Sequence, residues 1–318
     1  MQGNPSSPTE AVPDELLAYI LSPEVLGVEH VGIAARTCRR WYNSVPAHQR
    51  NRLSRQAVSR SIPLLRWALE NELPWRGRTP YENPCAIAAE GGHLDVIQWA
   101  RSQELPWNSF TCRQAALRGH LEVLQWAREN GCPWDPSICA SAAAGGHLEV
   151  LQWAKEHGCR WDPTTCSSAA AAGHLEVLRW AKENGCPWDE LLGCMAAKNG
   201  HLEVLQWAVE RDCPLRSWTW CWAAYGGSLE VLKWAKEKGC CDWGDGEMVC
   251  RAAARRGNLE VLQWARANGC AWDEGTMLAA TEGGHQPTLQ WMKENGCPQP
   301  THSTRRLMKA HKLNPPGL

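Results

Sequence analysis

The chain has 318 residues, with 33 Lys and Arg against 34 Asp and Glu, for a formal net charge of −1. This balance argues against a protein that binds nucleic acid mainly through phosphate contacts. No apolar run approaches the roughly 18 residues that a membrane helix needs. The Pro- and Ser-rich start also lacks the apolar core of a signal peptide. We therefore expect neither a nucleic-acid partner nor a membrane segment.

Residues 1–10 are expected to form a disordered tail, and residues 11–48 a small helical module. Its pattern is Pro-x-Glu-Leu, then Ile-Leu, then Cys-Arg-Arg-Trp, which resembles an F-box. The resemblance implies docking to a Skp-type adaptor subunit of a cullin ubiquitin ligase. The alternative is a helical cap over the first repeat that follows. The positions that would dock or form the core of the module are Pro13, Leu16, Leu17, Ile20, Leu21 and Trp41.

Residues 49–61 carry four arginines and are interpreted as a solvated linker helix. From there the chain is dominated by a repeated sequence motif that begins with Gly-x-Leu. The spacing between copies is 27 residues, except for 30 residues between Gly227 and Gly257. A fixed period of this size predicts a stacked array of helical repeats. The copies start at Gly92, Gly119, Gly146, Gly173, Gly200, Gly227 and Gly257, with a degraded copy at Gly284.

Each copy predicts two helices. The stretch from Leu175 to Asn184 places apolar residues over more than half of a helical circumference, so neighbours must cover it on two sides. Gly185 ends this helix as a left-handed cap. Asp162 is a natural N-cap for the other helix of the repeat, and Pro163 fits its first position.

The pattern Thr-x-Cys-x-x-Ala-Ala-x-x-Gly-His-Leu-Glu-Val-Leu resembles an ankyrin repeat, shortened to 27 residues. The missing residues fall where ankyrin repeats carry a β-hairpin finger, so we expect few or no strands. The predicted fold class is therefore all-α, a solenoid over residues 62–313. It would comprise an N-terminal half repeat, eight full repeats from about residue 83 to 297, and a C-terminal capping helix, with residues 314–318 as a tail.

Sixteen cysteines and twenty tryptophans follow the repeat closely. We expect the cysteines to be free thiols in the core of a protein from a reducing compartment, cytoplasmic or nuclear, rather than zinc ligands or disulfides. Sixteen of the tryptophans recur with the repeat and are predicted to be packing residues. The histidine that follows most turn glycines is predicted to cap the next helix, because serine and asparagine replace it in two copies. The sequence predicts no cofactor, no metal and no enzyme activity.

The residues that differ from one repeat to the next are the candidates for binding. Positions five, two and one before the turn glycine vary, and the ankyrin resemblance implies that they face a concave groove. Trp218, Trp222 and Tyr225 share one helical face and are flanked by cations, which is the composition of an interface hot spot. The alternative is that these rings pack the loop of the longer repeat. The candidate client-binding residues are Arg118, Met195, Lys198, Trp218, Trp222, Tyr225, Arg255 and Arg256.

Together these features predict a monomeric protein–protein interaction adaptor. By the F-box resemblance, it would bring a client protein to a Skp/cullin-type ubiquitin ligase. The alternative is an ankyrin-repeat scaffold or sequestering protein with no link to ubiquitin. Proteins that combine both modules occur in protists and in large DNA viruses, so the resemblance is compatible with a cellular adaptor or with a viral one in host cytoplasm. The sequence does not identify the client.

Overall fold

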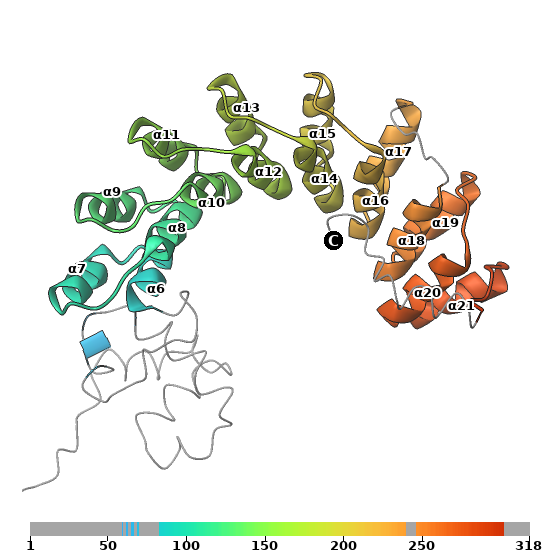
Figure 1. Ribbon diagram of the computed structural model, residues 1–318, viewed down its shortest axis with the longest axis horizontal. Helices are drawn as coiled ribbons and strands as arrows, with labels where there is room; N and C mark the ends of the chain where they lie inside the picture. The colour runs from blue at the N-terminus through green and yellow to red at the C-terminus, as the bar shows by residue number, and fades with distance from the viewer. Residues whose placement is uncertain are drawn as a thin grey trace, which may run out of the picture. The chain divides into compact units, whose positions relative to one another are not determined.

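The computed structural model describes residues 83–239 and 246–301, together with residues 59, 62, 65, 66 and 69. Its first and last elements are α6 (Pro84–Glu90) and α21 (Gln286–Glu294), and they bound sixteen α-helices with no strand in this part of the chain (Figure 1). The all-α fold class and the expected absence of hairpin fingers are therefore confirmed for these residues. The F-box-like module, the linker helix and the C-terminal capping helix lie outside the described residues.

The helices alternate between two types, and eight A–B pairs match the eight predicted repeats. The remaining A helices are α8 (Ser109–Arg118), α10 (Ser137–Gly145), α12 (Pro163–Ala172), α14 (Glu190–Asn199), α16 (Ser217–Gly226), α18 (Glu247–Arg256) and α20 (Glu274–Gly283). The remaining B helices are α7 (Leu94–Ser102), α9 (Leu121–Glu129), α11 (Leu148–Glu156), α13 (Leu175–Glu183), α15 (Leu202–Val209), α17 (Leu229–Glu237) and α19 (Leu259–Ala267).

The helix ends are where the local sequence predicts them. The Asp162 carboxylate accepts a hydrogen bond from the Thr164 amide at 2.9 Å, and Pro163 follows at the first position of α12. Gly173 ends that helix with φ +79°, and Gly185 follows α13 with φ +82°. These positive φ angles explain the glycines, because other residues adopt them only at a cost.

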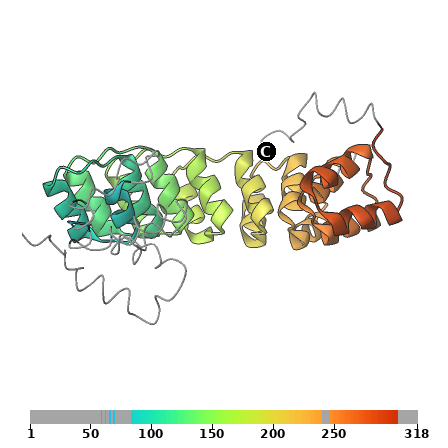
Figure 2. The same cartoon turned by 90° about the horizontal axis from the view of Figure 1, so that it is seen from below.

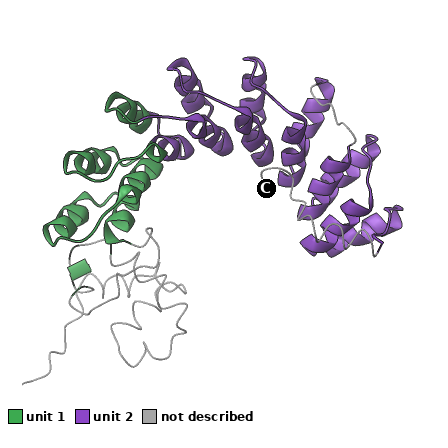
Figure 3. Cartoon of the chain, in the orientation of Figure 1, with its two compact units in different colours: residues 1–138, 149–159 green, residues 139–148, 160–318 purple. Residues whose placement is uncertain are grey.

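The chain divides into two compact units (Figure 3). The first comprises residues 1–138 and 149–159, and in it α6 packs against α7 and α8. The second comprises residues 139–148 and 160–318. In this unit the A helices α12, α14, α16, α18 and α20 pack in succession, as Figures 1 and 2 show, and each also contacts its own B helix.

The core of each repeat is built from small residues on the A helix and branched residues on the B helix. In one repeat these are Cys194 and Ala197 on α14, and Val204, Leu205 and Ala208 on α15, all buried. Small side chains let neighbouring A helices approach closely, while the B helices supply the apolar bulk.

All thirteen cysteines in the described part of the chain are free and buried, as predicted. The Cys186 thiol contacts the Asp162 carbonyl at 3.6 Å, and the Cys166 thiol hydrogen-bonds to Cys186. That hydrogen bond and burial raise the pKa of Cys166 well above its usual range. In this repeat the thiols therefore join the two ends as weakly polar core groups.

The recurring tryptophans pack against other side chains of the repeats. Most of those on B helices are half-buried rather than in the core. Trp180, for example, lies edge-on to Trp161 with ring centroids 5.7 Å apart, and the same pairing recurs between Trp188 and Trp207 at 5.6 Å. Lys182 places its ammonium 3.9 Å from the Trp188 ring centroid. The rings thus cover the junction between a B helix and the adjacent loops, with cations on their outer side.

The histidines after the turn glycines do not cap their own helices, so that prediction was wrong. His201 sits at the N-cap position of α15 without a side-chain capping bond. Instead its Nε2 lies 2.9 Å from the Ala171 carbonyl oxygen, in the preceding repeat. Its ring also lies over Gly173, where an added Cβ would be 2.5 Å away. The histidine therefore joins two repeats and satisfies a helix-end carbonyl that has no partner within its own helix.

Serine and asparagine perform the same task where they replace histidine. Ser228 donates to the Lys198 carbonyl at 3.3 Å, and Asn258 donates to the Tyr225 carbonyl at 2.9 Å. In each case the acceptor is the residue two before the turn glycine of the preceding repeat. All three side chains share a hydrogen-bond donor, which is the property that this position requires.

Candidate protein-binding surface

The variable residues of three consecutive A helices, α14, α16 and α18, share one helical face. On each helix they stand nine, five and two positions before the turn glycine, a spacing that keeps them on the same side. Because α16 packs against both α14 and α18, these positions form three rows across the helices. We call this set the nine-residue face: Leu191, Met195, Lys198, Trp218, Trp222, Tyr225, Met248, Ala252 and Arg255.

The row at the start of the helices is apolar and open. Leu191 is 45% exposed and Met248 is 40% exposed, and they are the two exposed large hydrophobic residues in the described part of the chain. Trp218, on the helix that packs between theirs, is half-buried and hydrogen-bonds to the Cys194 thiol. These two exposed side chains therefore lie on the same face, on α14 and α18, on either side of the helix that carries Trp218.

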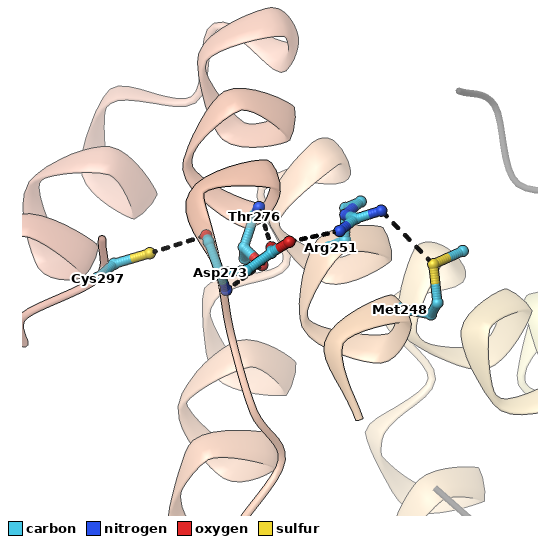
Figure 4. Close-up of polar contacts among 5 residues, drawn as sticks. All are labelled: Met248, Arg251, Asp273, Thr276 and Cys297. Atoms are coloured by element: carbon cyan, nitrogen blue, oxygen red, sulfur yellow. Dashed lines mark hydrogen bonds and ion pairs between the residues drawn. The ribbon is translucent and has the colours of Figure 1, made fainter. Parts of the chain in front are cut away.

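Met248 is held by a polar network (Figure 4). Arg251 places one guanidinium nitrogen 3.7 Å from the Met248 sulfur and another 2.7 Å from the Asp273 carboxylate. Asp273 is the N-cap of α20 and accepts from the Thr276 amide at 2.8 Å. The Cys297 thiol contacts its carbonyl at 3.7 Å. The exposed thioether thus rests on a fixed base that extends into the next repeat.

The opposite end of the face combines aromatic rings with cations. Trp222 and Tyr225 pack edge to face, with ring centroids 5.7 Å apart. Lys198 lies 4.9 Å from the Trp222 centroid and 5.7 Å from the Tyr225 centroid. Arg256, which follows Arg255 and borders the nine-residue face without being one of its nine residues, lies 5.0 Å from the Tyr225 centroid. Two cations from different repeats therefore meet at one tyrosine ring.

These two cations have no carboxylate partner in the part of the chain that the structure describes. Within the described repeats, neither Lys198 nor Arg256 pairs with a carboxylate, whereas Arg255 lies 3.7 Å from Glu282. The aromatic contacts therefore hold the charges in place without cancelling them. A positively charged end that lacks an anion is a recognition feature for an acidic group.

A close backbone contact positions this end of the face. A Cβ added to Gly226 would lie 1.7 Å from the Lys198 carbonyl oxygen, so the last turn of α16 touches that of α14. Ser228 donates to the same carbonyl. The backbone of Lys198 is thereby fixed beside the ring system, and its side chain extends over Trp222 and Tyr225.

The structure brings together four of the predicted residues, Lys198, Trp222, Tyr225 and Arg256. Trp222 is only 7% exposed and packs beneath the cluster instead of projecting from it. Trp218 lies one turn earlier on the same face, and Met195 is half-buried one turn before Lys198.

Two predicted residues engage carboxylates instead of joining the cluster. Arg118, in the first unit, forms an ion pair with Glu90 at 2.6 Å. Arg255 pairs with Glu282, as noted above. Both are in ion pairs within the chain, so they offer less charge to a partner than Lys198 or Arg256.

Sequence reasoning missed Leu191 and Met248, the most exposed apolar members of the face. Their signal lay in a position that was not compared, nine residues before the turn glycine. In three successive repeats this position holds Leu191, Trp218 and Met248, whereas the repeats before and after hold Thr164 and Gly275. The F-box-like residues Pro13, Leu16, Leu17, Ile20, Leu21 and Trp41 lie outside the described part of the chain.

No group of three or more His, Cys, Asp or Glu gathers among the described residues in the manner of a metal site. No described helix is both long enough and apolar enough to cross a membrane.

Comparison with known families gives one result. Residues 166–209 and 221–266 match the model for ankyrin repeats (many copies). These segments run from within α12 to α15 and from within α16 to α19, and so include α14, the second half of α16 and all of α18. No curated protein matches the chain significantly. Ankyrin repeats are typically non-enzymatic scaffolds that bind other proteins, and a protein-interaction role follows for this part of the chain.

Proposed function

We propose that the protein is an adaptor that holds a client protein on the nine-residue face and carries it to a Skp/cullin-type ubiquitin ligase. The client-binding half is supported by one observation: a single face carries the exposed Leu191 and Met248 at one end, and at the other end Lys198, which has no carboxylate partner among the described residues. Isolated exposed apolar residues need no explanation, but a cluster with fixed charges beside it is typical of an interface.

The ligase half of the proposal rests on the sequence of residues 11–48. If this stretch is helical, as the sequence predicts, Leu16, Leu17, Ile20 and Leu21 would lie on one apolar face, and Trp41 ends the second predicted segment. The pattern resembles an F-box, and linking a docking module to an interaction array would place the client beside the ligase.

The ligase link is tested by binding of the purified full chain to a recombinant Skp-type adaptor, measured by isothermal titration calorimetry. We expect micromolar or tighter binding, and loss of binding in the Leu16→Asp/Leu21→Asp variant. Leu191→Asp/Met248→Asp is the matched control, because it places the same charges on the repeats and should leave adaptor binding unchanged.

Absence of binding by the correctly folded full chain would remove the ligase link. The chain would then be a scaffold or sequestering protein that uses the same face, and residues 11–48 would be a helical cap. Equal loss of binding in both double variants would show that the effect is not specific to the F-box-like helix.

A further inference from the structure

We propose that the nine-residue face binds an extended acidic peptide segment of its partner, with apolar side chains at one end and carboxylates at the other. This inference rests on the proposed partner-binding function and specifies the chemistry of the segment that is bound. It follows from three features of the face: where its apolar groups lie, where its free charges lie, and how far apart these are.

The apolar end would receive hydrophobic side chains. Leu191 and Met248 expose nearly half of their surface, and Trp218 offers part of an indole ring between their helices. Burying such groups against an aliphatic or aromatic side chain stabilises a complex in proportion to the area removed from water. Because Arg251 already anchors the Met248 sulfur, little side-chain freedom is left to lose when a partner binds.

The charged end would receive carboxylates. Lys198 and Arg256 both rest on the Tyr225 ring, so their long side chains are largely ordered before a partner arrives. An arriving carboxylate could accept charge-assisted hydrogen bonds from them, which are stronger than neutral ones. Arg255 contributes less, because Glu282 already compensates its charge. The face therefore offers two positions for acidic side chains.

The distance between the two ends limits the spacing of the motif. Leu191 and Lys198 are seven residues apart on α14, which corresponds to about 10 Å along a helix. An extended peptide covers that distance in about three residues. The partner segment should therefore carry an apolar residue and an acidic residue about three positions apart.

Nucleic acid fits the face less well than a peptide does. Strong binding to the phosphate backbone needs many cations, whereas this end has two uncompensated ones and the chain has a net charge of −1. At the other end the most exposed groups are a leucine and a methionine, which are not stacking platforms for bases, and the one indole ring there, Trp218, is half-buried.

The test begins with selection of a phage-displayed library of random 12-residue peptides on the full chain. Synthetic copies of the enriched peptides are then titrated by fluorescence anisotropy. We expect enrichment of apolar and acidic residues about three positions apart. Lys198→Gln/Arg256→Gln should weaken binding roughly a hundredfold, about tenfold for each lost charge-assisted contact. Added NaCl should also weaken it.

The matched control is Arg179→Gln/Lys293→Gln, which removes the same charge from exposed positions on α13 and α21. It should leave binding within twofold of the original chain. Far-UV circular dichroism and the urea midpoint of both variants check that they remain folded.

Four results would overturn the inference. In the first, acidic peptides bind the Lys198→Gln/Arg256→Gln variant as well as the original chain, which would place their site elsewhere. The selected peptides could instead be neutral and be lost with Leu191→Asp, so that the client-binding face stands but its acidic specificity does not. A 20-nucleotide oligo-dT could displace the peptides and depend on the same two cations, in which case the ligand is nucleic acid. Enrichment of no peptide at all also rejects the inference, while the separate Skp-adaptor titration decides the ligase link.

Discussion

Replacing Gly226 with alanine should destabilise the protein, although alanine is the better helix former. The added Cβ would lie 1.7 Å from the Lys198 carbonyl oxygen, and contacts below 3.0 Å are essentially absent from real structures. The last turns of α14 and α16 must then separate by roughly 1.3 Å, and such overpacking typically costs about 1–3 kcal/mol. The gain in helix propensity is at most about 1 kcal/mol. We expect a net loss of about 1–2 kcal/mol in the free energy of unfolding.

Gly193→Ala in α14 is the matched control. Its Cβ would meet Leu215 Cδ2 at 2.2 Å, but that atom is the tip of a flexible side chain that can rotate away. The assay is urea unfolding of both variants followed by far-UV circular dichroism. The slope with urea must be compared as well as the midpoint, because repeat arrays can lose cooperativity. If Gly226→Ala is as stable as the original chain, or more stable than Gly193→Ala, the close approach of the two helices is wrong.

Three further predictions address the packing of the repeats. His201→Ala should lower the free energy of unfolding in urea by about 1–2 kcal/mol, because it leaves a helix-end carbonyl unpaired. His201→Asn keeps a donor and should cost less than half as much. Equal losses for the two variants would contradict the hydrogen bond between repeats. Burial raises the pKa of Cys213 and of Cys221 from 9.0 to about 11. Between pH 9 and 11 these thiols ionise only in the unfolded chain, so each should lower the free energy of unfolding by about 1.4 kcal/mol per pH unit. Cys213→Ala should reduce this dependence on pH, and an unchanged dependence would show that the thiol is not its source. Trp180→Ala should cost about 2 kcal/mol by thermal unfolding, below the 3–5 kcal/mol of a fully buried ring; a loss above 4 kcal/mol would mean that the ring is part of the core.

The local features of the fold could be predicted from the sequence because they depend on neighbours in the chain. Asp162 and Pro163 specify where α12 begins, and Gly173 specifies where it ends, whatever surrounds them. The 27-residue period then multiplies one helix pair into eight. Burial of the cysteines followed as well, since a residue that recurs on the inner side of every repeat is part of the shared core.

The features that escaped prediction depend on contacts between repeats. His201 looks like a local cap in the sequence, and only the stacked structure shows that the Ala171 carbonyl, 30 residues earlier, lies within reach. The sequence predicted that Trp180 is a packing residue, but not that its ring is half-buried against Trp161 at a loop junction. Leu191 and Met248 were overlooked because each is unremarkable alone and becomes significant only when the helices are placed side by side.

The bonds between repeats have a consequence for how such a chain can change over time. The donor side chain hydrogen-bonds to a backbone carbonyl oxygen, so this bond does not depend on the side chain of the acceptor residue. The acceptor residues are Glu90, Ala171, Lys198, Tyr225 and Arg255, which are chemically unrelated. Assembly and recognition thus use different atoms of the same residue. Mutation can therefore change the side chains of the acceptor residues while the hydrogen bond between repeats is kept. Whole repeats can also be gained or lost, because each new pair of neighbours can form the same bond.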